Sequence, residues 1–268
     1  MISVDDVPSQ ITDQVWRANR LWLFLDYDGT LAEFAPTPDQ VVPRPEVIDL
    51  LRRLSRLEHV RLAVISGRPL AHIQRLVPAF LLVLAGTYGI ELQLPDAAIV
   101  YRAKYSAVRP TLEQLKARWQ ALVAGQQGFF IEDKGWALAL HARFAEAAMA
   151  DQVLAAARST ALESITSDRF RLLNGQRFFE VAPVLAHKGR TVEYLLDRLA
   201  WPGALPLYLG DDDKDEEAFE VIHAHRGLTM LIATEPRATH AQARLPSPRD
   251  ARHWLAELAR HLKQKAEV

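Results

Sequence analysis

The stretch Leu21-Trp-Leu-Phe-Leu-Asp-Tyr-Asp-Gly-Thr-Leu31 decides the fold of this chain. It begins as an apolar run of five residues, which predicts a buried strand of a parallel sheet. Asp26 and Asp28 follow the run, so the strand carries two carboxylates to the carboxyl edge of the sheet, where α/β proteins hold their sites. A plain strand end with an Asx turn explains the same residues, and this stretch alone does not separate the two interpretations.

Carboxylates recur after a later strand of the chain. An apolar run over Leu205–Leu209 ends in Gly210-Asp-Asp-Asp-Lys-Asp-Glu216. Acidic clusters are usually solvated loops, but one placed directly after a buried strand favours a site for a hard cation such as Mg²⁺. A cation would also relieve the repulsion between Asp26 and Asp28, which otherwise raises the pKa of one of them.

Composition limits the class of protein. The 268 residues suffice for one large or two modest domains, and 49% of them are hydrophobic, so a packed core is expected. The net charge of −1 argues against a nucleic-acid partner. The chain has no cysteine, which excludes disulfides and thiol chemistry and suits the cytoplasm. Neither a signal-peptide core in 1–20 nor a membrane-spanning apolar stretch is present, so we expect no membrane association.

Further strand–loop–helix units surround the first strand. The strand expected over Val60–Ile65 runs into Ser66-Gly-Arg68, where a hydroxyl and free backbone N–H groups could hold a phosphoryl group, although a plain turn fits as well. Lys188 begins a helix predicted to Leu199 and opposes the helix dipole there, so a facing anion would offset its cost. The other expected core elements are helices over 45–57 and 217–225, strands over 81–85 and 229–233 (the last strand), and a terminal helix from Pro248.

An insert with a different pattern interrupts these units between Pro110 and about Pro183. It reads α-β-β-α-β-β, which predicts a small domain of antiparallel hairpins. The predicted elements are a helix over 111–123, strands over 129–132 and 136–143, a helix over 144–158, and a hairpin of 170–173 with 177–181 turning on Asn174-Gly175. Charged or titratable side chains at its strand edges are candidate ligand contacts or simply a solvated face: Glu132, Lys134, His141, Arg143 and Glu180.

Together the motifs resemble a known family. Asp26-Tyr-Asp-Gly-Thr30 resembles the first motif of the haloacid dehalogenase-like phosphatases. The longer Leu25–Leu31 phrase, with Pro36-Thr-Pro-Asp39 after it, resembles trehalose-6-phosphate phosphatases in particular. Ser66-Gly-Arg68, Lys188 and the Asp211 cluster stand in the order of the remaining motifs, and Gly128-Phe-Phe-Ile-Glu-Asp-Lys134 resembles a phrase of the family's cap.

The resemblance implies an α/β protein with a Rossmann-like haloacid dehalogenase core, a parallel sheet and an inserted α+β cap. The implied ranges are 1–109 and 186–268 for the core and 110–185 for the cap. The implied activity is Mg²⁺-dependent hydrolysis of trehalose 6-phosphate, a small sugar phosphate, through an aspartyl-phosphate. Separately from the resemblance, we expect a monomer in the cytoplasm.

Individual roles follow from the same resemblance. Asp26 is the implied nucleophile, Asp28 the general acid and base, and Lys188 the residue that orients the nucleophile. The implied phosphate contacts are Ser66, Gly67 and Lys188. The implied metal set is Asp26, Asp28, Asp211, Asp212 and Asp215, with Asp211 as a direct ligand. The implied substrate contacts are Arg68, Glu132, Lys134, His141, Arg143 and Glu180.

Two positions depart from the family pattern. Tyr88 stands where the family usually has a histidine, and Ala182 stands where it often has an arginine, which puts the roles of those residues in doubt. The alternatives are a phosphatase of the same fold for sucrose phosphate or a glycosyl-phosphoglycerate, a phosphomutase, and an inactive module that regulates a synthase.

Overall fold

The computed structural model describes residues 9–35, 37, 40–78, 82–175 and 177–266. The chain divides into two compact units. The core unit comprises Met1–Val100 and His187–Val268, and the insert unit comprises Tyr101–Ala186. The sequence places the corresponding borders at 109/110 and 185/186. Pro36, Pro38, Asp39 and Leu81, on which part of the sequence interpretation rests, lie outside the described residues.

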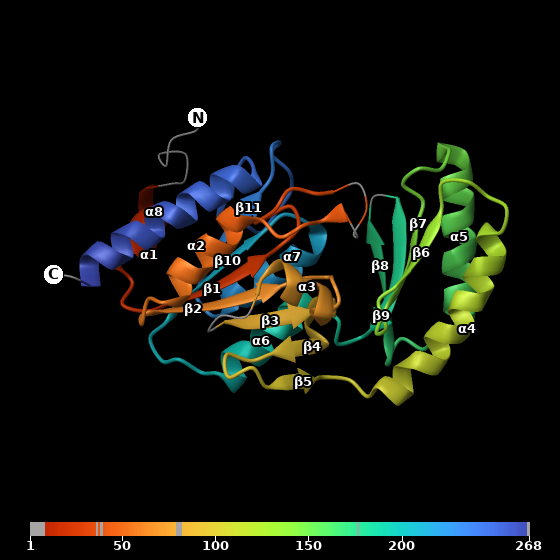
Figure 1. Cartoon of the computed structure of the whole chain (residues 1–268), viewed down its shortest axis with the longest axis horizontal. Helices are drawn as coiled ribbons and strands as arrows, with labels where there is room; N and C mark the ends of the chain where they lie inside the picture. Colours follow the sequence, from red (N-terminus) through yellow and green to blue (C-terminus); the bar gives the residue numbers. More distant parts are fainter. Residues whose placement is uncertain (1–8, 36, 38–39, 79–81, 176, 267–268) are drawn as a thin grey trace. The chain divides into compact units, whose positions relative to one another are not determined.

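An eight-stranded sheet forms the centre of the core unit, in the order β12-β11-β10-β1-β2-β3-β4-β5 (Figure 1). Its pairs are parallel from β12 to β3, and β4 runs antiparallel to β3. The strands are β1 Leu21–Asp26, β2 Val60–Ile65, β3 Val83–Gly86, β4 Glu91–Gln93, β5 Ile99–Tyr101, β10 Leu205–Gly210, β11 Leu228–Ile232 and β12 Ala243–Leu245. From β1 the chain continues to β2 on one side, and later strands add on the other through β10. Such a reversal of strand order opens a crevice at the carboxyl ends of the strands.

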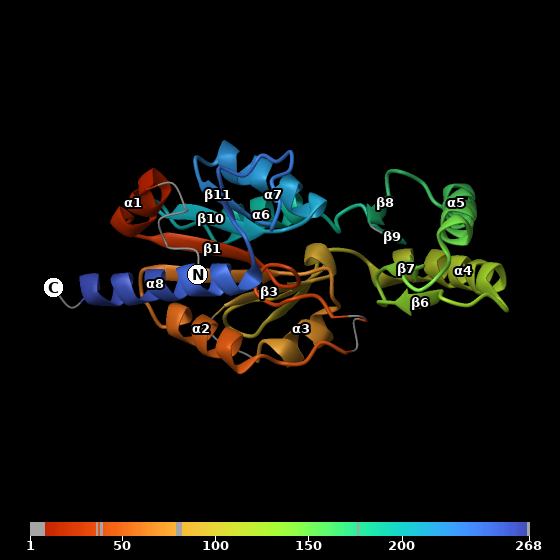
Figure 2. The same cartoon turned by 90° about the horizontal axis from the view of Figure 1, so that it is seen from above.

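Helices cover both faces of this sheet (Figure 2). One face carries α1 Ser9–Arg17, α2 Pro45–Ser55, α3 Leu70–Leu76 and α8 Pro248–Ala266. The other carries α6 Lys188–Arg198 and α7 Asp213–Ala224. Strand β1 lies between the two layers with all six residues buried, which explains why its sequence is an uninterrupted apolar run rather than an alternating one.

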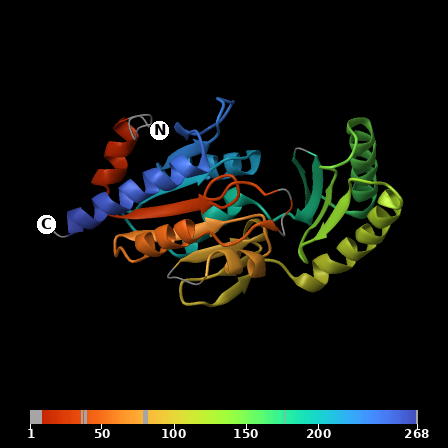
Figure 3. The same cartoon turned by 45° about the horizontal axis from the view of Figure 1, so that its top comes forward.

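The insert unit is a four-stranded antiparallel sheet in the order β6-β7-β9-β8 (Figure 3). Its elements are α4 Tyr105–Val123, β6 Phe130–Asp133, β7 Leu138–His141, α5 Ala147–Ser164, β8 Phe170–Gly175 and β9 Phe178–Pro183. The buried ring of Trp119 on α4 lies 5.7 Å from the ring of Phe179 on β9, and its indole N–H donates to the Ala157 carbonyl of α5. The two helices therefore pack together on one face of the sheet. The α/β class and the α-β-β-α-β-β order are confirmed.

Three predicted helices begin at a different residue from the one expected. Helix α4 begins at Tyr105 and not at Thr111, so Pro110 lies inside it. Proline usually marks a first turn, but here it is the sixth helical residue, and the packing of Leu112, Leu115 and Trp119 outweighs one lost backbone hydrogen bond. Helix α5 covers Ala147–Ser164 and not 144–158, because Glu146 caps its N-terminus. Helix α7 begins at Asp213 and not at Glu217.

The predicted turn of the second hairpin is also wrong. Asn174 and Gly175 pair with Phe179 and Phe178, so they belong to β8, and the turn that follows includes Arg177 at a φ of 64°. Strand β11 is not the last strand, since β12 adds beside it. Helix α1 and the three-residue strands β4, β5 and β12 were not predicted. In the described part of the chain no helix is both long and apolar enough to cross a membrane.

Candidate active site

Asp26 and Lys188 form a buried ion pair at the carboxyl edge of the core sheet. Asp26 is the last residue of β1 and Lys188 is the first residue of α6. The Lys188 ammonium donates to Asp26 Oδ1 at 2.7 Å and to Asp215 Oδ1 at 2.6 Å. The side chains of all three are at most 7% exposed. A lysine at a helix start thus faces anions, which offsets its unfavourable interaction with the helix dipole.

Asp215 uses both carboxylate oxygens for protein donors. Oδ1 also accepts the hydroxyl of Tyr208 at 2.7 Å, and Oδ2 accepts the backbone N–H groups of Asp211 and Asp212 at 3.0 Å each. Asp212 caps α7 by accepting from the N–H groups of Lys214 and Asp215, and a reciprocal capping box results. These two aspartates shape the loop after β10 and fix Lys188.

Asp211 occupies the loop between β10 and α7 and faces the first motif. Thr30 donates its hydroxyl to Asp211 Oδ1 at 3.2 Å. Gly29 has a φ of 85°, and a Cβ there would lie 2.2 Å from Asp211 Oδ2, so a side chain at this position would displace the carboxylate. Asp26, Asp211 and Asp215 each offer an oxygen atom within 4.8 Å of the others.

The pKa shifts of the clustered carboxylates favour the binding of a cation. Burial, together with repulsion from Asp215 and Asp212, raises the pKa of Asp211 to about 7. Burial also raises the pKa of Asp26, although Lys188 opposes the shift. The pKa of Asp212 is lowered, because Lys188 and Lys214 outweigh the effect of burial. A divalent cation between Asp26 and Asp211 would relieve the cost of ionising both, so the oxygen donor set fits Mg²⁺. Asp215 already has four donors and fits a supporting role.

Asp28 contacts Arg68 rather than the acidic group of Asp26, Asp211 and Asp215. The guanidinium of Arg68 donates through Nε to Asp28 Oδ2 at 2.6 Å and through Nη2 to Oδ1 at 2.8 Å. This bidentate contact fixes the plane of the Asp28 carboxylate. The predicted substrate contact Arg68 therefore orients the predicted general acid and base.

Ser66 follows the end of β2 at the same sheet edge. The register pairs Asp26 with Ile65, so Ser66 is the next residue beyond that pair. Its hydroxyl is buried and accepts the backbone N–H of Arg68 at 3.1 Å. Gly67 packs against Tyr88, since a Cβ on Gly67 would lie 2.7 Å from the Tyr88 hydroxyl oxygen.

The insert unit gathers its candidate residues on one face of its sheet. The register places Glu132 beside Ala139 and Ala139 beside Glu180, while Phe130, His141 and Phe178 form the next row. Lys134 donates to Glu180 Oε2 at 2.9 Å, and His141 Nε2 lies 2.9 Å from Glu132 Oε2. Arg143 is exposed beyond the end of β7. Four of the five predicted insert residues thus form two neighbouring pairs, Lys134 with Glu180 and His141 with Glu132.

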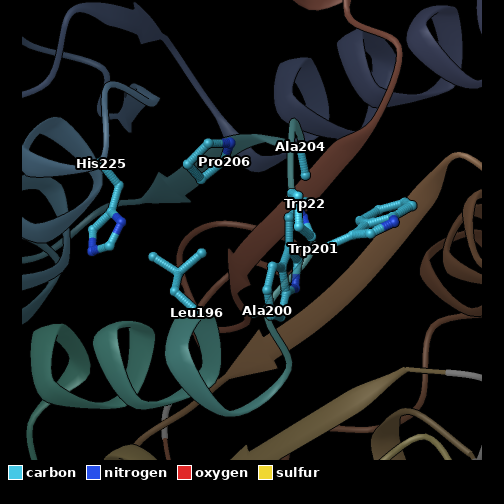
Figure 4. A pocket seen from close by; sticks show the side chains of 8 residues that line it. Trp22, Leu196, Ala200, Trp201, Ala204, Pro206 and His225 are labelled. Carbon is cyan, nitrogen blue, oxygen red and sulfur yellow. The ribbon is translucent and has the colours of Figure 1, made fainter.

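A cavity of about 200 Å³ lies elsewhere in the core unit (Figure 4). Its lining includes Trp22 near the start of β1, Pro206 near the start of β10, and Leu196, Trp201 and His225. Trp22 and Pro206 lie near the amino ends of their strands, opposite the edge that carries Asp26 and Asp211. The cavity is therefore separate from the acidic site.

Comparison with known proteins identifies the family. The family model described as trehalose-phosphatase matches residues 24–249. The chain belongs to the trehalose-phosphatase family. The resemblance inferred from the motifs is thereby confirmed.

Relatives within the family match over most of this chain. A probable trehalose-phosphate phosphatase of Sinorhizobium fredii is 33% identical over 88% of this chain and 87% of its own length. A trehalose-phosphate phosphatase of Mycobacterium bovis is 32% identical over 90% of this chain, which spans 62% of that protein. A trehalose 6-phosphate phosphatase of Zea mays is 28% identical over 91% of this chain and 71% of its own length.

Solved structures share the fold. The C-terminal domain of trehalose-6-phosphate phosphatase from C. albicans has a TM-score of 0.83 at 21% identity, over 94% of this chain and 96% of that one. A trehalose-6-phosphate phosphatase related protein has a TM-score of 0.77 at 21% identity, over 91% and 99%.

The two departures from the family pattern have distinct surroundings. Tyr88, which stands where the family pattern expects a histidine, is buried, and its ring lies beside Gly67. Ala182 pairs directly with Arg171 across β8 and β9, so an arginine stands opposite the position where the family often has one. Tyr208, which donates to Asp215, was missed in the sequence. The only sign of its role in the sequence is a side chain with a hydroxyl group inside the apolar run Leu205–Leu209.

Proposed function

We propose that this chain hydrolyses trehalose 6-phosphate to trehalose and inorganic phosphate. The observation that carries the proposal is the buried contact between Asp26 and Lys188 inside an acidic group at the crevice of the core sheet. Trehalose 6-phosphate is proposed as the substrate because the relatives compared above are described as trehalose-phosphate phosphatases. Phosphate monoesters resist hydrolysis so strongly that accelerations of up to about 10²¹-fold are known, and a positioned carboxylate nucleophile serves that need.

In the first step an oxygen of Asp26 attacks phosphorus, and the bond from phosphorus to the sugar oxygen breaks. The products of this step are an aspartyl-phosphate and an alkoxide that takes a proton from Asp28. Lys188 holds Asp26 Oδ1 at 2.7 Å and thereby fixes the rotamer of the nucleophile. The ammonium of Lys188 neutralises charge on the oxygens of the transferring phosphoryl group, and the hydroxyl of Ser66 binds one of these oxygens.

In the second step water attacks the same phosphorus atom. Asp28, now ionised, takes a proton from that water, and the acyl phosphate bond breaks to release phosphate and regenerate Asp26. The two hydrogen bonds from Arg68 orient the ionised Asp28 carboxylate for this transfer.

Asp26 and Asp211 would hold Mg²⁺, while Asp212 and Asp215 support the loop that presents Asp211. When bound, the cation supplies positive charge against the developing charge on the phosphoryl oxygens. Asp28 is also predicted as a ligand. Because Arg68 holds its carboxylate, Asp28 would bind the cation through its backbone carbonyl oxygen.

The insert unit would give the enzyme its preference for a disaccharide. Glu132, Lys134, His141 and Glu180 present carboxylate, ammonium and imidazole groups, which are suitable partners for sugar hydroxyls, and Arg143 adds a guanidinium. Binding energy from parts of a substrate remote from the reacting bond positions the reacting group. Monomeric state and cytoplasmic location stay predictions.

Phosphate release from a panel of phosphorylated mono- and disaccharides with Mg²⁺ tests the proposal. Trehalose 6-phosphate should give the highest kcat/KM, and EDTA should stop the reaction. A higher value for sucrose phosphate or a glycosyl-phosphoglycerate would contradict the substrate. An isomerised sugar phosphate as product would indicate a mutase, and no release from any ester would indicate an inactive module.

A further inference from the structure

Two consecutive residues beside the site adopt a backbone conformation that their side chains disfavour. Thr87 has a φ of 47° and Tyr88 a φ of 54°, and both are buried in the core unit. A β-branched residue at positive φ is an outlier that persists only where the surroundings hold it. Glu91 provides part of that support, because its Oε2 accepts the Thr87 hydroxyl at 3.1 Å and the Leu70 N–H at 3.0 Å.

On one side this turn holds the loop that carries Ser66. The N–H of Tyr88 donates to the Ser66 carbonyl at 2.8 Å, and the N–H of Thr87 donates to the Arg68 carbonyl at 2.7 Å. The ring of Tyr88 fills the space beside Gly67. Backbone and ring together bind all three residues of the predicted phosphate loop.

On the other side the same turn holds α6. The hydroxyl of Thr191 donates to the Tyr88 carbonyl at 2.7 Å, and Thr191 is fully buried. Gly89 makes this approach possible, since a Cβ there would lie 2.0 Å from Thr191 Oγ1. Thr191 follows Lys188 by three residues, so the two side chains lie on the same face of α6, one turn apart.

We propose that the hydroxyl of Thr191 is a positioning group for phosphoryl transfer, an inference that rests on the proposed function. Through Tyr88 it connects the Ser66 loop to the helix that carries Lys188. In this strained turn Tyr88 donates its N–H to the Ser66 carbonyl and accepts the Thr191 hydroxyl of α6 at its own carbonyl. A misplacement of about 1 Å between groups that bind one phosphoryl unit can cost about 100-fold in rate.

Thr191→Val and Thr191→Ser test the inference, with para-nitrophenyl phosphate and Mg²⁺ as the assay. Thr229→Val is the matched control, because Thr229 is equally buried on β11 and its hydroxyl also makes a hydrogen bond with the backbone, accepting the N–H of Gln242 at 3.2 Å, and lies 2.9 Å from His223 Nε2. Thr191→Val should lower kcat about tenfold or more with little change in KM. Thr191→Ser should restore most of kcat, and Thr229→Val should leave it within about twofold.

Hydrogen exchange of the peptide over residues 85–91 gives a second readout that needs no turnover. Exchange should become faster in Thr191→Val and stay as in the wild type in Thr191→Ser and Thr229→Val. Unchanged kcat in Thr191→Val, an equal loss in Thr191→Ser, or an equal loss in Thr229→Val would each overturn the inference. If the wild type hydrolysed no phosphate ester, the proposed function would fail, whereas the exchange data would still judge the connection.

Discussion

Two lysines, one in each unit, bind carboxylates in different ways. Lys188 in the core unit contacts Asp26 and Asp215 together, and Asp211 and Asp212 lie in the same acidic group, where Asp212 also pairs with Lys214. Lys134 in the insert unit contacts Glu180, and the neighbouring Glu132 contacts His141. When fully ionised, the four core carboxylates carry two more charges than Lys188 and Lys214, whereas Glu180 and Glu132 of the insert unit each lie beside a basic side chain.

This difference indicates two kinds of ligand. Two surplus charges equal the charge of one divalent cation, and burial together with the neighbouring carboxylates raises the pKa of Asp26 and Asp211, so ionising both is costly without a cation. In the insert unit Lys134 balances the charge of Glu180, and the side chains offer hydrogen-bond donors and acceptors to neutral hydroxyls. This contrast supports the proposal that cation and phosphoryl chemistry belong to the core unit and sugar recognition to the insert unit.

The largest effect should come from Asp26→Asn. The change removes the attacking charge at nearly constant volume, so turnover should fall by at least about 10³-fold on every ester. Phosphate release on trehalose 6-phosphate and on para-nitrophenyl phosphate would measure it, with circular dichroism to verify the fold. Near-normal activity in a folded variant would remove Asp26 from the role of nucleophile.

Changes in the insert unit should separate the two substrates. Loss of a charged hydrogen bond costs about 1.5–3 kcal/mol, so Lys134→Ala should lower kcat/KM for trehalose 6-phosphate roughly ten- to a hundredfold. Hydrolysis of para-nitrophenyl phosphate should stay within about twofold, since that ester offers no sugar hydroxyls.

Lys116→Ala is the control for Lys134→Ala. Lys116 lies on α4 and pairs with Asp133 Oδ2 at 2.8 Å, so it is an insert lysine outside the proposed sugar-binding face. Both substrates should be hydrolysed within about twofold of the wild-type rate. Equal losses on both substrates in Lys134→Ala would mean that the pair serves folding rather than recognition.

A smaller effect should appear in the pH dependence of stabilisation by Mg²⁺. In the metal-free protein the pKa of Asp211 is about 7, above its ordinary value, so this carboxyl stabilises the fold at low pH and loses that contribution as pH rises through 7. Mg²⁺ must displace the proton, and its apparent affinity should fall about tenfold per pH unit below 7. The rise in Tm with Mg²⁺ should be larger at pH 8 than at pH 6. An equal rise at both values would show that Asp211 does not compete with protons for the cation.

The sequence predicted what depends on strands and on adjacent residues. Asp26, Ser66, Lys188 and Asp211 each follow an apolar run or open a helix, and parallel strands carry such residues to one edge. The contact of Asp28 with Arg68 joins residues 40 positions apart. No periodicity encodes that pair, and it emerges only when β1 and β2 lie in register.

Element ends were harder to predict, because tertiary contacts set them. Pro110 carries a helix-start signal that packing overrides, and Asn174-Gly175 carries a turn signal although strand pairing extends to Gly175. The strained conformation of Thr87 and Tyr88 has no signal in residue types that disfavour it. Such a feature becomes visible only with the hydrogen bonds that hold it.

Isothermal titration with Mg²⁺ tests the central claim, that the surplus charge of the core group binds one divalent cation. Wild-type protein at pH 8 should bind one Mg²⁺, Asp211→Asn should bind it at least about tenfold more weakly, and Glu132→Gln in the insert unit should bind it as the wild type does. Wild-type affinity in Asp211→Asn, or a loss of binding in Glu132→Gln, would contradict this division between the two units.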